Sequence, residues 1–405
     1  MSDNNIKRSP YWLDEPLILG QVALPKSAEI VVIGSGLSGA SSCYWLQEKG
    51  FHDITMLDHR SDTAASYRNC GHILNGTVES PVALTKLLGV ESARNIWQFS
   101  VEVCDDVANT IDRLSLQADY KRDGYLVMAV DAVEDQEIRE SIAILKDFSI
   151  DNEYLTTNDL ENLGFRNVYG ARFEASSAQA HPVKFRNGLV KHSLAHGLKY
   201  CTEAKVLDVK DQGSFVTVST EKGDITCEAV VIAANAYSSL LSSYYHKHRL
   251  VEPFRGQIIC SKPLKGNIPV SYPHSFDHGY EYALATEDNR LMIGGWRQNT
   301  EGGETGTYDL TPNETVELGL KNFTKHHYQF DEELEWEYSW SGIMATSRTG
   351  LPFIGPTNSP RIYTVSGFTG HGFSWAHGSA KLLANIMAGD DIPEVAKFFD
   401  PRPLK

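Results

Sequence analysis

A glycine-rich turn between an apolar segment and a helical pattern constrains this chain most, in the stretch AEIVVIGSGLSGASSCYWLQEKG. Positions 30–33 are apolar and β-branched, which predicts a buried parallel strand. Gly34, Gly36 and Gly39 then match G-x-G-x-x-G at the start of a helix that should end at Gly50. Such glycines allow a tight turn, a close approach of pyrophosphate and close helix–strand packing, while the helix N-terminus attracts negative charge. The stretch therefore predicts a dinucleotide site.

An acidic residue follows this turn at a useful distance. The segment DITMLD predicts a second strand, and it ends on Asp58, nineteen positions after Gly39. A carboxylate at this spacing is suited to accept hydrogen bonds from a ribose. The strand, the helix and Asp58 together favour nucleotide binding over an empty turn, but they leave NAD and FAD equally open.

Composition limits the other classes of function. The chain has 405 residues, of which 41% are hydrophobic and 22% charged, enough for two domains or one large interleaved domain. A formal net charge of -15 argues against nucleic acid or an anionic membrane as partner, because both reward clustered Lys and Arg. The N-terminus lacks the apolar core of a signal peptide, and no run approaches a membrane span. We expect a cytoplasmic protein.

Cysteine and histidine spacing gives no sign of a metal or of disulfides. The six cysteines contain no C-x-x-C pair, so neither a disulfide framework nor structural zinc is expected. The histidine pairs 246/248 and 326/327 lack further ligands at useful spacing. We predict no metal site.

Later segments predict a second sheet and a second glycine-lined helix start. Alternation and turn signals over 251–295 predict an antiparallel sheet with a hairpin around 287–289. Near the C-terminus, a strand at 362–365 precedes a glycine-rich turn and a helix that should end near Gly389. A helix N-terminus stabilises the negative charge that a reduced isoalloxazine ring gathers, so this second start favours a flavoprotein over an NAD enzyme.

Six further motifs occur in an order typical of one family. They are AASYRNCGHI (64–73), AHPVKFRNGL (180–189), EPFRGQI (252–258), YEYALATEDNRLMIGG (280–295), WSGIMATSRTGLPFIG (340–355) and GFTGHGF (367–373). With the glycine turn, they make the chain resemble the FAD-dependent D-amino-acid oxidase superfamily, within it the glycine oxidase, sarcosine oxidase and gamma-glutamylputrescine oxidase group. The resemblance covers nearly the whole chain, from about Glu29 to Gly389.

The resemblance implies an α/β fold (α+β overall) in which a discontinuous Rossmann-like FAD-binding domain is interleaved with an antiparallel-sheet substrate domain. It also implies hydride transfer from a carbon–nitrogen bond to flavin N5, with reoxidation by O₂ or another electron acceptor. The expected FAD-binding segments are 27–90, 165–250 and 335–390, the substrate segments are 91–164 and 251–334, and the terminal extensions are 1–26 and 391–405.

The same resemblance assigns residues to the cofactor. Near the adenosine and pyrophosphate it places Gly34, Gly36, Leu37, Ser38, Gly39, Asp58, His59, Ser66, Arg68 and Val206. Near the flavin ring it places Gly71, His72, Thr369, Gly370, His371, Gly372 and Phe373. Ala233, Ala234 and Gly342 are expected near the cofactor.

Catalytic and substrate roles are expected for a smaller set. The catalytic candidates are His72, Tyr282, Trp340 at the floor of the pocket and His371, which if protonated would support reduced flavin. Tyr282, Arg297, Met344 and Arg348 are the substrate-binding candidates. No cysteine lies beyond Cys260, so the C-terminal flavin linkage of sarcosine-oxidase-like proteins is excluded, and only Cys70 or His72 could attach the flavin. We expect noncovalent FAD.

Met344 departs from the family pattern. Glycine and D-amino-acid oxidases place an arginine at this position to hold the substrate carboxylate, and a thioether cannot replace its bidentate hydrogen bonds. We therefore expect a small-molecule amine as substrate, secondary or long, such as an acylated polyamine, bound as the neutral amine. The alternatives are an FAD-dependent 2-hydroxy-acid or D-amino-acid oxidase or dehydrogenase, an NAD-dependent dehydrogenase and a non-catalytic flavin-binding subunit.

Overall fold

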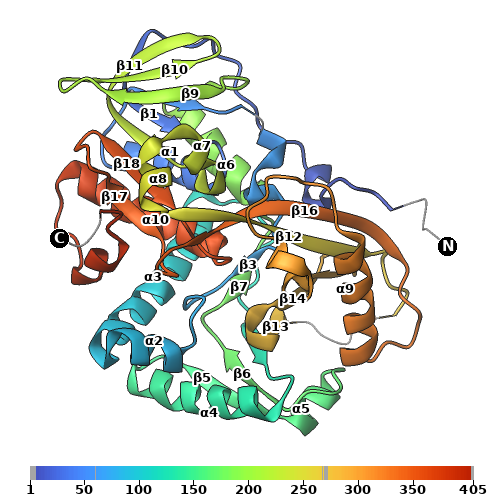
Figure 1. Ribbon diagram of the computed structural model, residues 1–405. Helices are drawn as coiled ribbons and strands as arrows, with labels where there is room; N and C mark the ends of the chain where they lie inside the picture. Colours follow the sequence, from blue (N-terminus) through green and yellow to red (C-terminus); the bar gives the residue numbers. More distant parts are fainter. Residues whose placement is uncertain (1–5, 60, 267, 269–271, 403–405) are drawn as a thin grey trace.

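The computed structural model describes residues 6–59, 61–266, 268 and 272–402, and their strands form two eight-stranded sheets and one small sheet (Figure 1). The small sheet pairs β3 (His72–Ile73) with β7 (Ala178–Gln179). This architecture confirms the expected α/β fold.

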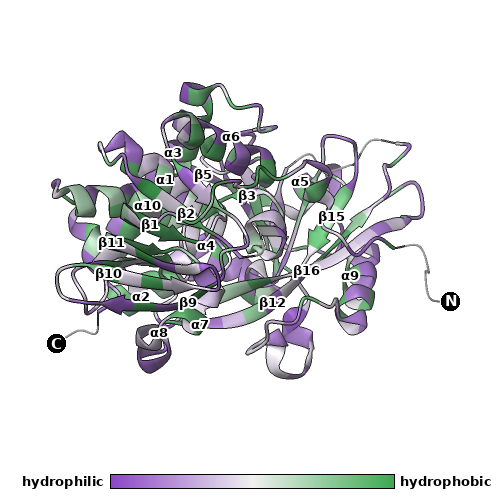
Figure 2. Cartoon of the chain, turned by 90° about the horizontal axis from the view of Figure 1, so that it is seen from above, coloured by the Kyte–Doolittle hydropathy of each residue, from purple (hydrophilic) through white to green (hydrophobic). Residues whose placement is uncertain are grey.

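The first sheet is built around the strand that precedes the glycine turn. Its order is β17 (Phe353–Pro356), β18 (Ile362–Ser366), β11 (Gly223–Ile232), β1 (Ser27–Ile33), β2 (Ile54–Leu57) and β8 (Lys199–Cys201), with β10 (Val216–Thr220) paired to β11 and β9 (Val206–Asp211). β1 runs parallel to both neighbours, with Ile30 opposite Ile54 and Ala229. Both faces of these central strands are covered, which explains why they are continuously apolar rather than alternating (Figure 2).

Long helices cover one face of the first sheet. α1 (Leu37–Glu48) packs against α10 (Gly372–Ala388) and α6 (Pro182–Ala195), and α10 packs against α3 (Val90–Leu114). α10 ends at Gly389, which has φ 75° in the left-handed conformation that a helix C-cap requires. The predicted ends of the first and last helices are therefore correct to within a few residues.

The second sheet carries the predicted hairpin. Its order is β16 (Trp336–Ser347), β12 (Val251–Ser261), β15 (Leu291–Gly294), β14 (Glu281–Ala285), β13 (His274–Phe276), β4 (Tyr125–Met128), β6 (Gly170–Glu174) and β5 (Asn152–Thr156). The remaining helices are α2 (Pro81–Leu88), α4 (Ala132–Asp147), α5 (Thr157–Asn162), α7 (Ser238–Leu241), α8 (Ser243–His248) and α9 (Glu314–His327). α2, α4 and α5 lie together at the bottom of the molecule in Figure 1.

Three elements cross the expected domain boundaries. β6 lies in 165–250 and β16 in 335–390, yet both pair into the second sheet. α3 lies in 91–164 but packs with α10 beside the first sheet. The placement of β6 and β16 follows from their long pairings with β5 and β12, which a division by sequence motif does not reveal.

The described parts of both termini are packed rather than free. Trp12 is buried and its Nε1 donates to Asn69 O at 2.7 Å. Phe399 is buried against Phe99 and Trp375. Within the described ranges, no helix is both long enough and apolar enough to cross a membrane.

Candidate active site

The glycine turn leaves no room for side chains. Gly34 has φ 104°, and a Cβ on Gly39 would lie 1.8 Å from Gly34 O. A Cβ on Gly36 would lie 2.8 Å from Ser66 Oγ, which itself accepts a hydrogen bond from Leu37 N at 2.8 Å. The turn therefore brings backbone N–H groups close to whatever lies beside it, as the sequence predicts.

Ser35, at the centre of the turn, is held from both sides. Asp58 accepts hydrogen bonds from Ser35 N, at 3.1 Å, and from Ser35 Oγ. The Ser35 carbonyl accepts from Tyr67 Oη at 3.0 Å and from Arg186 Nε at 2.9 Å. Arg186 is fully buried and also donates to Tyr200 Oη at 3.0 Å. These bonds fix the orientation of the turn.

Sequence alone gives Arg186 no role in the site, although this residue lies in the motif AHPVKFRNGL. From sequence alone, an arginine in a helix is expected at the surface. Its contact with the turn at Ser35 becomes known only from the structure. In α6, Arg186 and Asn187 both lie on the buried side of the helix, and this position is what indicates a supporting role.

A cavity of about 990 Å³ begins at this turn and extends to the second sheet. Most of the predicted site residues line it. The lining includes Gly34, Gly36, Leu37, Ser38, Asp58, His59, Ser66, Arg68, His72, Val206, Ala233, Ala234, Tyr282, Arg297, Gly342, Met344, Thr369, Gly370, His371, Gly372 and Phe373. The structure thus gathers residues from segments separated by more than 300 positions of sequence.

Four predicted residues lie elsewhere. Gly39 packs under the turn, and Gly71, with φ 78°, packs against Ala180 O. Trp340 is buried in a core cluster and donates to Arg68 O at 3.1 Å, so it supports the wall instead of forming the pocket floor. Arg348 is exposed and donates to His248 O at 3.2 Å, because it follows the end of β16. Arg348 therefore lies outside the lining of the cavity.

The second helix start lies at the same cavity. His371 is the N-cap residue of α10, and its side chain makes no capping hydrogen bond. Burial lowers the pKa of His371. The imidazole is therefore neutral at neutral pH, so the condition under which His371 would support reduced flavin as a cation is not met.

His72 is also neutral. Burial lowers its pKa to about 3, and its Nε2 lies 3.1 Å from Ala283 O, an arrangement that requires a proton on Nε2. Its ring packs edge-on against Tyr125, at 5.2 Å between centroids, and against Tyr282 at 6.2 Å. His72 is therefore a fixed wall residue rather than a cationic one.

Cys70 lines the cavity as a protonated thiol. Burial raises its pKa well above the ordinary value for cysteine. A thiol is a poor nucleophile compared with a thiolate, and this favours the predicted noncovalent flavin. All six cysteines are free, as the sequence indicates.

The second sheet supplies the opposite wall. A Cβ on Gly256 would lie 2.4 Å from Met344 Cε and 3.6 Å from Tyr282 Oη, so the two side chains meet above this glycine. Glu281 points to the other face of β14, where its Oε1 accepts from Gln298 Nε2 at 2.7 Å. Tyr282, the next residue on β14, lines the cavity.

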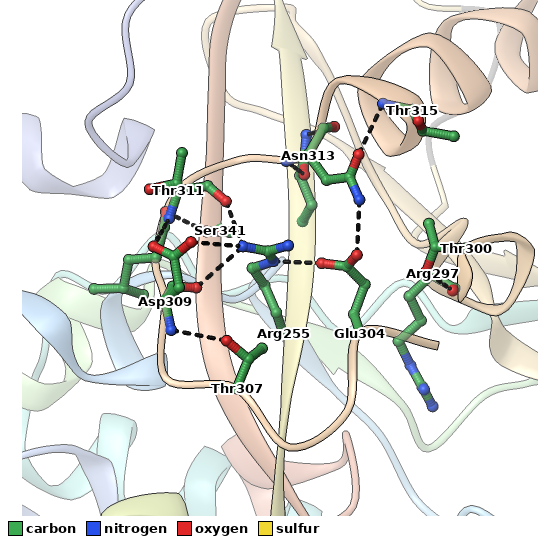
Figure 3. Close-up of polar contacts among 12 residues, drawn as sticks. Arg255, Arg297, Thr300, Glu304, Thr307, Asp309, Thr311, Asn313, Thr315 and Ser341 are labelled. Carbon is green, nitrogen blue, oxygen red and sulfur yellow. Dashed lines mark hydrogen bonds and ion pairs between the residues drawn. The ribbon is translucent and has the colours of Figure 1, made fainter. Parts of the chain in front are cut away.

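Residues 297–313 contribute Arg297, Tyr308 and Leu310 to the cavity lining, and Figure 3 shows polar contacts that hold this segment in place. Arg255 Nε pairs with Glu304 Oε2, and Arg255 Nη1 donates to Thr311 O at 2.7 Å. Asn313 Nδ2 donates to Glu304 Oε1 at 2.7 Å. Because these bonds anchor the segment to β12, it holds Arg297 at the cavity, with its guanidinium 4.5 Å from the centroid of the Phe254 ring.

The histidine pairs considered for metal do not form a cluster of ligands with acidic groups in the described part of the chain. A different group, Glu134, Asp277 and His278, brings its ligand atoms within 4.8 Å of one another. Glu134 accepts hydrogen bonds from His278 N, at 2.6 Å, and Val130 N, at 2.9 Å. These bonds account for the position of Glu134 without an ion.

Comparison with known proteins identifies the family. The family model described as FAD dependent oxidoreductase matches residues 29–386. The chain belongs to this FAD-dependent oxidoreductase family. The resemblance drawn from the six motifs is thereby confirmed, and FAD is the cofactor of the chain.

Individual relatives agree in coverage. A probable oxidoreductase OrdL of Haemophilus influenzae is 27% identical over 370 residues, which are 90% of this chain and 84% of the relative. The gamma-glutamylputrescine oxidoreductase of Escherichia coli is 25% identical over 380 residues, with the same coverage of 90% and 84%. The crystal structure of glycine oxidase from Geobacillus kaustophilus superposes with a TM-score of 0.79 at 18% identity and covers 94% of this chain and 100% of that one. It shows a shared fold.

The geometry fits FAD. A dinucleotide needs a turn free of Cβ atoms, a helix N-terminus facing its phosphates and an acidic partner for ribose, and Gly36, α1 and Asp58 supply them at one end of the cavity. The N-terminus of α10 lies at the same cavity. The volume is at the upper end of the range for ligand sites, as a large cofactor plus a substrate requires.

Proposed function

We propose that this FAD-dependent oxidoreductase oxidises a carbon–nitrogen bond of an amine, with O₂ or another electron acceptor reoxidising the flavin. FAD, when bound, supplies the hydride acceptor. Gly34 to Ser38, Asp58, Ser66 and Arg68 would hold its adenosine diphosphate part. The wall of His72, Tyr282 and Met344 would then face the reacting carbon of the substrate.

The observation that carries the proposal is the wall formed by Met344 and Tyr282 above Gly256. A thioether provides no hydrogen bonds to a carboxylate, and an ionised carboxylate buried beside it would lose several kcal/mol of solvation. Burial raises the pKa of Tyr282, so its phenol stays protonated and offers one hydrogen bond to a neutral group. This wall suits an amine or an alkyl chain better than an α-carboxylate.

The protonation states of the wall determine which form of the amine reacts. His72 and His371 are neutral, and Tyr282 is protonated, so none of the three carries a charge that would hold an ammonium group at the reacting carbon. An amine that loses hydride from its carbon needs the nitrogen lone pair. The neutral amine is therefore the reactive form, and kcat/KM should rise toward alkaline pH until the free amine predominates.

The names of the relatives support the same class. One is a gamma-glutamylputrescine oxidoreductase, and others are D-amino acid dehydrogenases, for example that of Bradyrhizobium diazoefficiens. Among these classes, the thioether at position 344 favours the amine over the α-amino acid. Arg297 in the cavity lining remains available for an acidic group farther along a substrate.

Anaerobic bleaching of the flavin tests the proposal. The purified holoprotein is mixed with primary and secondary amines, glycine, sarcosine, D-alanine and 2-hydroxy acids, and the flavin absorbance is followed. Amines should reduce the flavin fastest, and admission of air should restore the colour and yield hydrogen peroxide if O₂ is the acceptor. Fastest reduction by a 2-hydroxy acid or by glycine would refute the assignment, and no reduction by any compound would favour a flavin-binding subunit.

A further inference from the structure

The wall formed by His72, Tyr282 and Met344 is called the flavin wall below. A second part of the cavity lies away from it. We call it the distal lobe and define it as the part lined by α4, β4, β6 and residues 74–80. Four cavity-lining residues connect it to the flavin wall along one row of the second sheet, because Tyr282 is opposite Ser275, Ser275 opposite Val127, and Val127 opposite Arg172. Three strand spacings separate the ends of this row, roughly 14 Å.

The distal lobe carries an excess of negative charge. Its basic side chain, Arg172, is buried and pairs with Glu174 at 2.6 Å. Glu79, Glu134 and Glu137 also line the lobe, so three carboxylates remain after this pair is set aside. Among the described residues of α4, β4, β6 and 74–80 that line the cavity, Arg172 is the only basic one; His278, just outside this set, lies 3.9 Å from Glu134 through its Nδ1.

Buried acceptor atoms in the distal lobe have no partner. Asn75 is 4% exposed and lines the cavity, yet its Oδ1 makes no hydrogen bond within the described structure. Ser141, 1% exposed, lines the cavity from α4, and its Oγ is likewise without a partner there. Buried polar atoms in folded proteins are nearly always satisfied, so these two atoms, which line the same cavity as the three carboxylates, are open to hydrogen bonds from a bound donor.

Resting on the proposed function, we infer that the distal lobe binds a second, positively charged amino group of the substrate, so that the preferred substrates are long diamines or polyamines. An ammonium group offers three N–H donors and one positive charge, which match the open acceptors and the carboxylates. The distance from Tyr282 to Arg172 sets the length: a four-carbon diamine is too short to reach from one end to the other, whereas an eight-carbon chain covers most of it.

In this assignment the two amino groups of one substrate lie in different electrostatic surroundings and therefore differ in protonation state. At the flavin wall, neutral side chains favour the free amine. In the distal lobe, carboxylates favour the ammonium ion. The substrate should therefore bind with one amino group neutral and the other charged.

Three substrates of equal length test the inference: an eight-carbon terminal diamine, the eight-carbon monoamine and the eight-carbon terminal amino acid. The expected order of kcat/KM is diamine, then monoamine, then amino acid, and only the diamine should lose activity steeply as salt is added. A higher kcat/KM for the amino acid than for the diamine would mean that the lobe binds a carboxylate through Arg172. Equal kcat/KM values for the diamine and the monoamine would mean that the lobe does not bind the second ammonium group. Either result overturns the inference.

Glu137→Gln provides the variant. Glu137 Oε1 accepts from Ser80 Oγ, and a glutamine retains that acceptor while removing the charge. We expect the diamine-to-monoamine ratio of kcat/KM to fall about tenfold, mainly through KM. Glu140→Gln is the matched control, since Glu140 is exposed on the same helix and lies outside the cavity lining. An equal ratio in the two variants would contradict the assignment.

Isothermal titration with an octyltrimethylammonium ion tests the charge of the lobe without turnover, because its one nitrogen has no lone pair and its alkyl chain leaves the flavin wall uncharged. It should bind the holoprotein about tenfold more weakly after Glu137→Gln. If this difference is found but no amine bleaches the flavin, the proposed oxidation fails and the cation site stands. If amines bleach the flavin but neither the ratio nor the titration responds to Glu137→Gln, the oxidation stands and the cation site fails.

Discussion

Removal of the Asp58 carboxylate should weaken FAD binding by an amount that the contacts of Ser35 allow to be estimated. Asp58 accepts from Ser35 N at 3.1 Å and from Ser35 Oγ, so it orients the turn, and it also lines the cavity. A hydrogen bond to a charged group contributes about 1.5 to 3 kcal/mol. If Asp58→Ala removes one such bond to ribose, the binding free energy of FAD falls by this amount, and the FAD Kd should rise roughly 10- to 150-fold.

The assay is titration of apoprotein with FAD, followed by the change in flavin fluorescence at fixed ionic strength. Asp58→Asn keeps an acceptor for Ser35 N but loses the charge, so its Kd should fall between those of the parent protein and Asp58→Ala. Asp53→Ala is the matched control, because Asp53 precedes the same strand at its far end and forms an exposed ion pair with Lys199 at 2.7 Å. Thermal unfolding of the apoproteins distinguishes two effects: a destabilised turn lowers the Tm of the apoprotein, whereas the loss of a contact to FAD leaves this Tm unchanged. Equal Kd values for Asp58→Ala and Asp53→Ala would refute the assignment of Asp58 to the nucleotide.

Three further outcomes follow from the site and its surroundings. Gly36→Val should give folded, colourless protein, because even a Cβ there lies 2.8 Å from Ser66 Oγ, and a yellow variant in the absorbance spectrum would contradict the binding model. Met344→Arg should shift kcat/KM from long amines toward glycine and D-alanine by about tenfold or more, and an unchanged ratio in steady-state assays would show that position 344 does not select the substrate. Burial lowers the pKa of His377 to about 3, below the unfolded value of about 6.5, so stability is lost as the pH falls from about 6.5 toward 3. Between pH 7 and pH 5.5 this histidine accounts for about 1.2 kcal/mol, and denaturant unfolding of His377→Gln should show a correspondingly weaker pH dependence.

The nucleotide end of the site could be predicted because its determinants are local. The tight turn, the helix start and Asp58 are fixed by residues within about one strand–helix–strand unit, and each glycine has a steric reason that the sequence pattern already contains. The hairpin between β14 and β15 was predictable for the same reason, since Glu287 to Asn289 form its short connection.

The amine end could not be predicted in this way because it depends on pairing between distant strands. Arg172 is a cavity residue only because β6 pairs with β4, and a strand of alternating side chains gives no sign of its partner. Arg348 lies outside the cavity lining for the opposite reason: it is only four positions beyond Met344, but β16 ends at Ser347 and the chain turns outward. A role assigned by proximity in sequence is therefore weaker past the end of a strand than within it.

The two ends of the cavity differ in how freely they can change. The turn at Gly36 and the hydrogen-bonded Ser35 are packed so closely that substitution there disturbs cofactor binding. Tyr282 and Val127, by contrast, are side chains on the row of a rigid sheet whose backbone pairing does not depend on their identity. Substitution along this row can alter the length and charge of the accepted amine while the nucleotide site stays intact. This separation explains physically how a shared fold can accompany relatives named for different amines and amino acids.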